Sequence, residues 1–359
     1  MISVTKPFLP PLEEYQEYVQ GIWQRNWLTN NGPLVNQLEL ELKDYLQLKH
    51  LLYLGNGTIA LQIAFKALGL TGEVITTPFS YVATVSSLVW EGLKPVFVDV
   101  DPDSLNIDPK KIEAAITPNT SAILATHVYG NPCEVDKIQK IANKHGLKVV
   151  YDAAHCFATT YKGKSIFAYG DISTTSFHAT KVFHTIEGGA VVTQDPELLR
   201  KMALMRNFGH TGTNTFEEVG INGKNSEFHA AMGLVNLRHI GTILKSRKEQ
   251  WYFYRELLKD FEAKTIELLE PEGYNYSYFP LILPNEEFLE KCVDILQVNY
   301  IFPRRYFYPS LNQLPYLNTQ STPISEDYSK RVLCLPLFHD LSEETQHMIA
   351  RFLLRVQNN

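Results

Sequence analysis

The sequence contains few cysteines, no long apolar run and no excess of positive charge. Its four cysteines are far apart and lack Cys-x-x-Cys spacing, so the pattern indicates neither a disulfide framework nor a zinc site. No apolar stretch reaches membrane-spanning length, and the first residues lack the apolar core of a signal peptide. The net charge of -6 argues against non-specific nucleic-acid binding. We therefore expect a cytoplasmic protein without a metal site, a membrane segment or a nucleic-acid partner.

Length and composition are those of an ordinary globular protein with two domains. The chain has 359 residues, too many for one small core, and its hydrophobic content of 45% is typical of such proteins. After Arg247 the composition shifts toward aromatic and charged residues. We expect a larger domain over residues 1–240, which includes a helical N-terminal segment, and a smaller α+β domain over residues 241–359.

From about residue 50 the sequence alternates between strand-like and helix-like stretches. The strand-like stretches are His50–Leu54, Glu73–Thr77, Pro95–Val100, Ser121–His127, Leu147–Tyr151, Ile172–Phe177 and Ala190–Gln194. The helical patterns are Thr58–Leu68, Tyr81–Glu91, Pro109–Ile116, Glu134–His145, Pro196–Arg206 and Ser226–Ile240. This alternation predicts an α/β fold with a mostly parallel seven-stranded sheet that carries helices on both faces.

Lys181 lies in a polar turn between two of these expected strands. An amine held between buried strands can have a lowered pKa and form a Schiff base with a carbonyl compound. Ser176 offers a hydroxyl at the end of the preceding strand, and Gly188-Gly189 allow the backbone to approach a ligand closely. An exposed loop lysine is the alternative interpretation, and the residues at the other strand ends decide between the two.

Ligands of open α/β sheets bind beyond the carboxyl ends of the strands. There, Gly57-Thr58 begin a helix and offer backbone N–H groups to an anion. Later strands are followed by Tyr81, Asp152 and His155, which offer an aromatic face, a carboxylate and an imidazole. Each of the three residues also has a structural alternative, namely packing for Tyr81, a structural cap for Asp152 and a neutral core histidine for His155. Beside a reactive lysine, however, these groups form the parts of a pyridoxal 5'-phosphate (PLP) site, in which a carboxylate keeps the pyridine nitrogen protonated.

The turn Gly55-x-Gly57-x-x-Ala60 also fits the looser dinucleotide fingerprint. That fingerprint needs an acid at the end of the second strand, where Thr76-Thr77 stand. It also leaves Asp152 and Lys181 without a role. An NAD-dependent dehydrogenase that uses Gly55–Ala60 remains an alternative.

The sequence resembles the DegT/StrS family of sugar-nucleotide aminotransferases, which are fold-type I PLP enzymes, over nearly its whole length. The stretches that carry the resemblance are Trp27-x-Thr29-x-x-Gly32-Pro33, Asn56-Gly57-Thr58-x-Ala60-Leu61, Asp152-Ala153-Ala154-His155, Ser176-Phe177-x-x-x-Lys181 and Glu187-Gly188-Gly189. The resemblance implies the fold of that class and its cofactor, which alternates between PLP and pyridoxamine phosphate (PMP).

The resemblance also implies a role for each matching residue. Lys181 carries the cofactor covalently and moves protons to and from the amine-bearing carbon. Asp152 pairs with the pyridine nitrogen, Tyr81 stacks on the ring, and His155 stands where the family has His or Gln beside the cofactor. The implied phosphate contacts are Gly57, Thr58 and Ser176.

A second subunit is implied by the stretch Gly220–Lys224. It aligns with a family loop that reaches the phosphate of the neighbouring subunit, with Asn222 as the expected contact, so the resemblance implies a homodimer with shared active sites. The family often has arginine where Lys224 stands. The loop Phe302–Thr322 is rich in Pro, Tyr and Asn and is expected to be an active-site flap or a subunit contact. The candidate substrate contacts are Trp27, Thr29, His184, Lys224, Arg304 and Tyr306.

The implied reaction is transamination of a nucleotide-linked 4-keto-6-deoxyhexose with L-glutamate as amino donor. The residues that follow Lys181 resemble those of the C4-aminating members. Within that group, the sequence is most similar to the transaminases that form dTDP-4-amino-4,6-dideoxy-D-glucose for O-antigen synthesis. A sugar-nucleotide 3-aminotransferase is the nearest alternative, and a dehydratase that uses the same cofactor is expected to carry histidine in place of Lys181. A non-catalytic regulator or sugar sensor is expected to lack Lys181 or Asp152, and both are present.

Overall fold

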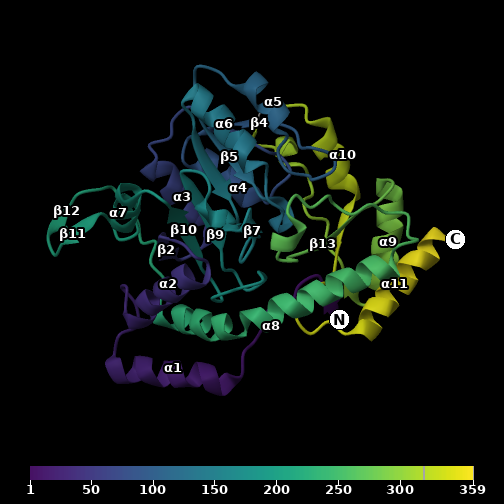
Figure 1. Ribbon diagram of the computed structural model, residues 1–359, viewed down its shortest axis with the longest axis horizontal. Coiled ribbons are helices and arrows are strands. Elements are labelled where there is room, and N and C mark those ends of the chain that lie inside the picture. Colours follow the sequence, from purple (N-terminus) through teal and green to yellow (C-terminus); the bar gives the residue numbers. More distant parts are fainter. Residues whose placement is uncertain (318–319, 359) are drawn as a thin grey trace.

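The computed structural model describes residues 1–317 and 320–358. Its central sheet has seven strands in the order β2-β10-β9-β6-β5-β3-β4 (Figure 1). These strands are β2 (His50–Leu54), β3 (Glu73–Thr76), β4 (Lys94–Phe97), β5 (Thr120–Thr126), β6 (Lys148–Asp152), β9 (Ile172–Ser176) and β10 (Gly189–Thr193). Strand β10 is antiparallel to β2 and β9, whereas the remaining neighbours are parallel. The predicted mostly parallel seven-stranded sheet is confirmed, with the largest boundary shift at β4, which ends at Phe97 rather than Val100.

Helices cover both faces of this sheet, as crossover connections require. They are α2 (Pro33–Tyr45), α3 (Gly57–Ala67), α4 (Val82–Trp90), α5 (Pro109–Ile112), α6 (Val135–His145), α7 (Pro196–Met205) and α8 (Glu227–Leu257). Successive residues of β2 point to opposite faces. Leu51 and Tyr53 belong to the apolar cluster that contains residues of α2, α6 and α8, whereas Leu52 and Leu54 belong to the cluster of α3, α4 and α7. The sheet is therefore buried on both sides.

Helix α8 connects the sheet to the C-terminal part of the chain. It continues to Leu257, past the predicted end at Ile240, and Figure 1 shows it running beneath both parts. The reason is that buried residues continue at helical spacing beyond that point, at Arg247, Gln250, Trp251 and Tyr254. The division of the chain at residues 240/241 stays a prediction, and this helix is continuous across it.

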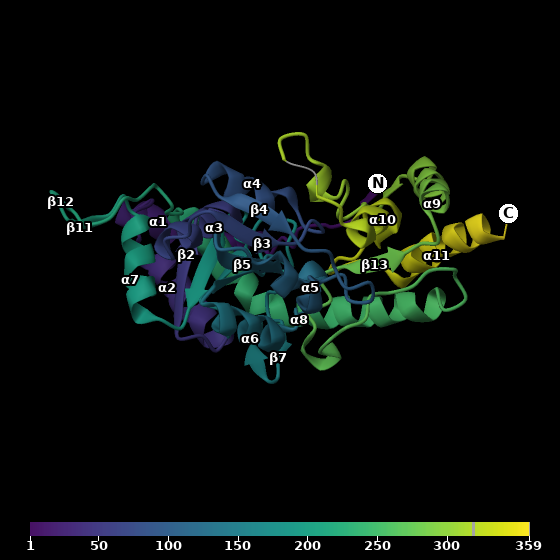
Figure 2. The ribbon, with the colours of Figure 1, turned by 90° about the horizontal axis from the view of Figure 1, so that it is seen from above.

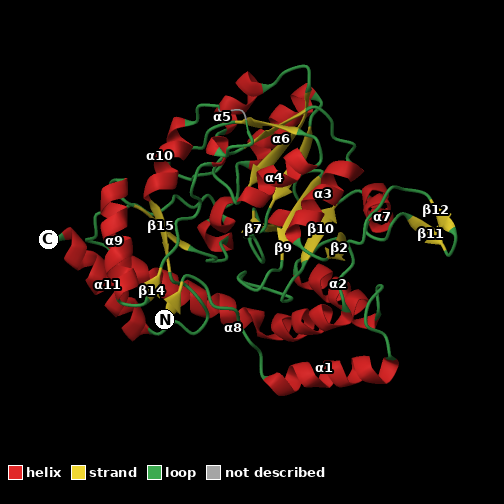
Figure 3. Cartoon of the chain, turned by 180° about the vertical axis from the view of Figure 1, so that it is seen from behind, coloured by secondary structure: helices red, strands yellow, loops and turns green. Residues whose placement is uncertain are grey.

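The C-terminal part is a small α+β layer with its own apolar cluster. Strand β13 (Phe279–Ile282) pairs antiparallel with β15 (Val332–Leu335). Strand β1 (Ile2–Ser3) pairs parallel with β14 (Ile301–Phe302), so the N-terminus lies against this part of the molecule (Figure 3). The helices here are α9 (Glu286–Val298), α10 (Pro323–Arg331) and α11 (Glu343–Gln357).

Three further elements lie outside these layers. Helix α1 (Leu12–Arg25) packs on α8, and the hairpin of β11 (His210–Gly212) and β12 (Thr215–Phe216) projects from the end of the molecule near α7 (Figure 2). A short hairpin joins β7 (Thr160–Tyr161) to β8 (Lys164–Ser165). Within the described residues, no helix combines the length and apolar character needed to cross a membrane.

Candidate active site

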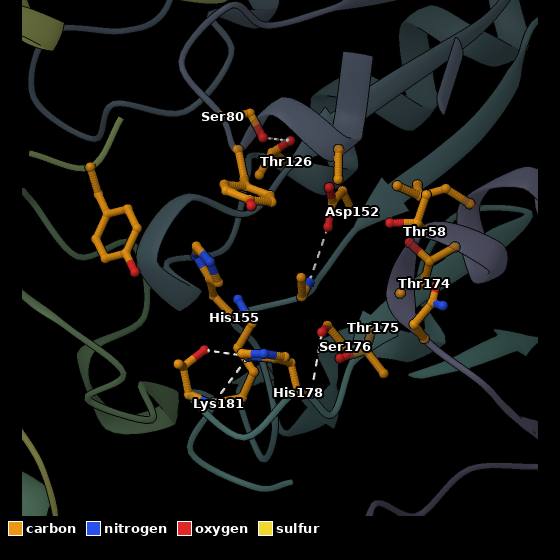
Figure 4. A pocket seen from close by; sticks show the side chains of 18 of the residues that line it. Thr58, Ser80, Thr126, Asp152, His155, Thr174, Thr175, Ser176, His178 and Lys181 are labelled. Atoms are coloured by element: carbon orange, nitrogen blue, oxygen red, sulfur yellow. Dashed lines mark hydrogen bonds between the residues drawn. The ribbon is translucent and has the colours of Figure 1, made fainter. Parts of the chain in front are cut away.

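A pocket of about 270 Å³ lies at the carboxyl ends of β5, β6 and β9 (Figure 4). It receives residues from the start of α3, the segment before α4, the ends of β6 and β9, the turn after β9 and the C-terminal part. The predicted site residues that line it are Gly57, Thr58, Tyr81, Asp152, His155, Ser176, Lys181, Arg304 and Tyr306. Segments far apart in the sequence therefore bring an anion cradle, a carboxylate, an amine and aromatic rings to one sheet edge.

The start of α3 forms the anion-binding corner of this pocket. Asn56 caps the helix by accepting a backbone N–H through its side chain at 2.8 Å. Gly189 of β10 packs directly on this turn, where an added Cβ would lie 2.5 Å from the carbonyl carbon of Asn56 and 2.7 Å from the nitrogen of Gly57. A Cβ on Gly57 would lie 3.0 Å from that of Ser176, which closes the cradle from the other side. The free N–H groups of the helix start and the hydroxyls of Thr58 and Ser176 suit a phosphate.

The amine of Lys181 shares the pocket with the carboxylate of Asp152. Burial lowers the pKa of Lys181 to about 8, an effect that the negative charge of Asp152 opposes and that the positive charge of Arg304 reinforces. Part of the amine is therefore neutral near neutral pH. A neutral, buried amine is what a lysine needs in order to act as a nucleophile or base.

Asp152 ends strand β6 and is only 7% exposed. Its carboxylate accepts hydrogen bonds from the Thr84 hydroxyl at 2.7 Å and from the N–H of Ala154 at 3.2 Å. Burial raises the pKa of this carboxyl, whereas these two hydrogen bonds and the charge of Lys181 lower it, and burial is the largest effect. A buried carboxylate of this kind favours a cationic partner in the pocket.

His155 presents an unsatisfied nitrogen at the same site. Its ring stacks on Phe307, with centroids 5.8 Å apart and planes 7° apart, and lies 4.8 Å from Tyr278. Burial holds the pKa of His155 well below its usual value, so the ring is neutral. Its Nδ1 is buried and has no hydrogen-bond partner within the described chain. A bound ligand that forms a hydrogen bond with this nitrogen would explain why it has no partner in the described chain.

The residues of the pocket can be compared with the groups that PLP needs. The cofactor needs a phosphate cradle, a carboxylate for its pyridine nitrogen, an amine for its carbonyl and a flat surface for its ring. The cradle at Gly57, the buried Asp152 and the lowered pKa of Lys181 match the first three needs. The Nδ1 of His155, which has no partner within the described residues, is free for a further polar contact with a ligand. Tyr81, which is 53% exposed at the pocket, offers an aromatic face. The residues therefore fit the cofactor.

Arg304 and Tyr306 reach the pocket from the segment after β14. The guanidinium of Arg304 lies 4.7 Å from the centroid of the Tyr306 ring, so the two side chains form one cationic and aromatic surface. The expected flap or subunit contact at Phe302–Thr322 thus supplies part of the pocket lining. Residues 318 and 319 of that loop lie outside the described residues.

His184 does not reach the pocket lining formed by the described residues. Its Nε2 is hydrogen-bonded to the carbonyl of Phe8 at 2.7 Å, and its Nδ1 accepts the N–H of Ile186 at 3.2 Å. Asn236 donates to its carbonyl at 2.9 Å. Both ring nitrogens are therefore engaged within the chain, which leaves neither for the substrate contact expected from the sequence.

Four other predicted residues lie outside the lining that the described chain provides: Trp27, Thr29, Asn222 and Lys224. Trp27 is 47% exposed and its indole N–H donates to the carbonyl of Thr29 at 2.7 Å. Lys224 donates to the side-chain oxygen of Asn207 at 2.6 Å. Asn222 is exposed and forms an isolated antiparallel bridge with Asn207. Their expected roles toward substrate and a second subunit stay predictions.

Sequence reasoning missed three hydroxyl-bearing residues at the pocket, of which Ser80 and Thr126 line it. Ser80, Thr84 and Thr126 are buried and linked to Asp152 by hydrogen bonds. Ser80 precedes α4 and Thr84 lies in its first turn, so helical spacing does not relate the two and no local pattern in the sequence indicates them. Their link to Asp152 depends on tertiary packing.

Comparison with known proteins identifies the family to which the chain is similar. Residues 12–353 match the model of the DegT/DnrJ/EryC1/StrS aminotransferase family. The chain is 45% identical to the dTDP-4-amino-4,6-dideoxy-D-glucose transaminase of Shigella dysenteriae, over 99% of both chains. The structure of DesI in the presence of its TDP-sugar product superposes with a TM-score of 0.93 at 32% identity, over 99% of this chain and 93% of that one. NtdA from Bacillus subtilis, solved with bound PMP, superposes with a TM-score of 0.90 at 27% identity, over 97% of this chain and 82% of that one.

Proposed function

Because the chain belongs to the DegT/DnrJ/EryC1/StrS aminotransferase family, we propose that it is a PLP-dependent transaminase of a nucleotide-linked 4-keto-6-deoxyhexose. The observation that carries the proposal is the convergence of Lys181, Asp152 and the start of α3 on one pocket. The match over nearly the whole chain supports the same activity.

The proposed acceptor is dTDP-4-keto-6-deoxy-D-glucose and the product is dTDP-4-amino-4,6-dideoxy-D-glucose. The Shigella relative is named for this product and is 45% identical over 99% of its length. We propose L-glutamate as the amino donor and a role in O-antigen synthesis. A cytoplasmic location is consistent with the four cysteines, which are all buried free thiols.

The pocket residues divide the work of the reaction. PLP, when bound, supplies a carbonyl that accepts an amine and a ring that withdraws electrons from the neighbouring carbon. The amine of Lys181 would hold the cofactor and, once released, would take and return the proton at the carbon that bears the transferred amine. Asp152 would accept a hydrogen bond from the ring nitrogen and keep it protonated. The N-terminus of α3 and Ser176 would bind the phosphate, Tyr81 would offer its face to the ring, and His155 would stand beside the cofactor.

We also propose that two copies of the chain share their active sites. Several apolar side chains are exposed, and a second copy of the chain would cover them. They include Trp27, Ile186, Phe208 and Ile221, which are between 40% and 48% exposed. Asn222 directly follows Ile221 and is exposed, as a residue that reaches the partner's phosphate must be. Arg304 and Tyr306 would face the diphosphate of the sugar nucleotide.

The test is an absorption spectrum of the purified protein with PLP, recorded before and after L-glutamate is added. We expect a visible band that glutamate bleaches and that dTDP-4-keto-6-deoxy-D-glucose restores. The Lys181→Ala variant should show neither the band of the lysine-bound cofactor nor turnover. A band that glutamate leaves unchanged contradicts the transaminase. Restoration by a 3-keto sugar alone supports the C3 enzyme, and tight NAD binding without PLP uptake supports the dehydrogenase.

A further inference from the structure

Three buried hydroxyl groups lead in a row to the carboxylate of Asp152. The side-chain oxygens of Thr126 and Ser80 are 3.0 Å apart, those of Ser80 and Thr84 are 2.7 Å apart, and that of Thr84 is 2.7 Å from Asp152 (Figure 4 shows the first of these contacts). The three residues are at most 4% exposed. Thr84 has no exposed surface, so bulk water cannot replace its contact with Asp152.

The chemistry of the groups fixes the direction of this row. An ionised carboxylate only accepts hydrogen bonds, so Thr84 must donate its one hydroxyl hydrogen to Asp152. The oxygen of Thr84 can then only accept from Ser80, and the oxygen of Ser80 can only accept from Thr126. Every hydroxyl in the row therefore points its hydrogen toward Asp152. Aligned hydrogen bonds polarise one another, which strengthens the last one.

The fold supplies this arrangement from three neighbouring elements. Thr126 and Asp152 end the adjacent parallel strands β5 and β6 and are partners in register. Tyr81 caps the start of α4, and the N–H of Thr84 donates to the carbonyl of Tyr81 at 3.1 Å. The same helical turn thus presents Tyr81 to the pocket and Thr84 to the carboxylate.

We propose that Thr84 is a positioning residue for the reaction. Its hydroxyl holds the Asp152 carboxylate as a hydrogen-bond acceptor for the ring nitrogen of the cofactor. Ser80 and Thr126 set the direction of the hydrogen bond from Thr84 to Asp152. This inference rests on the proposed function. Without Thr84, the buried carboxylate is less stable as an anion, so the proton shared with the ring nitrogen moves toward Asp152. The other titratable groups that face this carboxylate are Lys181, His155 and Cys156.

The test uses PLP labelled with ¹⁵N at the ring and bound to the full-length protein. We expect a pyridinium signal in the wild type and, in Thr84→Val, a shift toward the signal of neutral pyridine, because valine keeps the shape and lacks the hydroxyl. Thr84→Ser should restore the wild-type signal. We expect the rate of the glutamate half-reaction to fall by about ten- to a hundredfold in Thr84→Val, the factor for one hydrogen bond to a charged group.

The matched control is Ser87→Ala on the same helix. Ser87 is 1% exposed and donates to the backbone carbonyl of Thr84 at 3.2 Å, so its loss removes a buried hydroxyl that is not part of the row. It should leave the ¹⁵N signal unchanged. If Thr84→Val does not fold, Ser80→Ala removes the donor to Thr84 and should shift the signal in the same direction by a smaller amount.

The outcomes separate this inference from the proposed function. An unchanged ¹⁵N signal in folded Thr84→Val, or in Ser80→Ala where only that variant folds, overturns the role of Thr84. A wild-type protein that binds PLP without transaminating overturns the proposed function alone, because the ring-nitrogen signal needs binding and not turnover. A wild-type protein that binds no PLP overturns both.

Discussion

Arg206 and Glu39 form a largely buried ion pair next to β2, with a guanidinium nitrogen 2.5 Å from a carboxylate oxygen. The same carboxylate accepts the N–H of Tyr53 at 2.8 Å, and Arg206 donates to the carbonyl of Tyr53 at 3.0 Å. The carbonyl of Arg206 in turn accepts the N–H of Gly223 at 2.9 Å. The pair therefore ties together α2, β2 and the segment that carries Asn222.

We predict that Glu39→Ala is strongly destabilising. It leaves the guanidinium of Arg206 buried without its counter-charge, which typically lowers the free energy of unfolding by about 3–5 kcal/mol. Urea unfolding followed by circular dichroism measures the change. Glu287→Ala, which breaks the exposed pair with Lys291, is the control and should change stability by less than about 1 kcal/mol. Equal effects of the two substitutions would show that the Arg206–Glu39 pair does not act as a buried pair.

A second prediction concerns the pH dependence of cofactor uptake. The pKa of Lys181 is lowered to about 8 by burial, so its amine is mostly protonated below that pH and mostly neutral above it. Only the neutral amine attacks a carbonyl. The rate of PLP uptake by apoprotein should therefore rise with pH and level off above about 8, as measured by the growth of the visible band.

The control for this pH profile is free PLP mixed with a simple alkyl amine, whose rate keeps rising toward the ordinary lysine pKa of 10.5. A protein profile with its midpoint near 10.5 would contradict the lowered pKa. Lys181→Arg should show no such uptake, because its side chain stays charged throughout this range.

Strand periodicity and strand ends explain why so much of the fold and site could be predicted from the sequence. Asp152 and Ser176 close buried strands whose apolar runs are easy to recognise, and the parallel arrangement brings such ends to one edge. His184 shows the limit, because its partner Phe8 lies 176 residues away in the sequence and no local pattern indicates that contact. The row of hydroxyl groups next to Asp152 depends in the same way on packing between α4, β5 and β6. Helix α8 extends beyond Ile240 because buried residues, among them Trp251 and Tyr254, continue at helical spacing.

Gly189 provides a third prediction, on the geometry of the phosphate cradle. A Cβ at this position would lie 2.5 Å from the backbone of Asn56, so Gly189→Ala must displace the start of α3. We expect PLP to bind about tenfold or more weakly and the free energy of unfolding to fall by about 1–3 kcal/mol, the usual effect of overpacking. Equilibrium dialysis with PLP and thermal unfolding measure the two effects.

Gly241→Ala is the matched control for that substitution. Gly241 lies within α8, and beyond the backbone of its own helical turns an added Cβ would meet no atom of the described residues within 4 Å. Alanine there should raise stability by about 0.5–1 kcal/mol through helix propensity and leave PLP binding unchanged. Unchanged PLP binding in Gly189→Ala would mean that the turn beside β10 does not hold the phosphate.

The last prediction tests whether two subunits share each active site. Asn222→Asp places a negative charge where the proposed partner phosphate binds, and Lys181→Ala removes the amine, so each variant alone should be nearly inactive. In a mixed dimer, one of the two sites then combines an intact Lys181 with an intact Asn222 from the other subunit. Mixing the two variants and allowing subunit exchange should therefore restore about a quarter of wild-type activity, because half of the dimers are mixed and each has one intact site. If Asn222 served the pocket of its own chain, both sites of a mixed dimer would carry a defect and mixing would restore nothing.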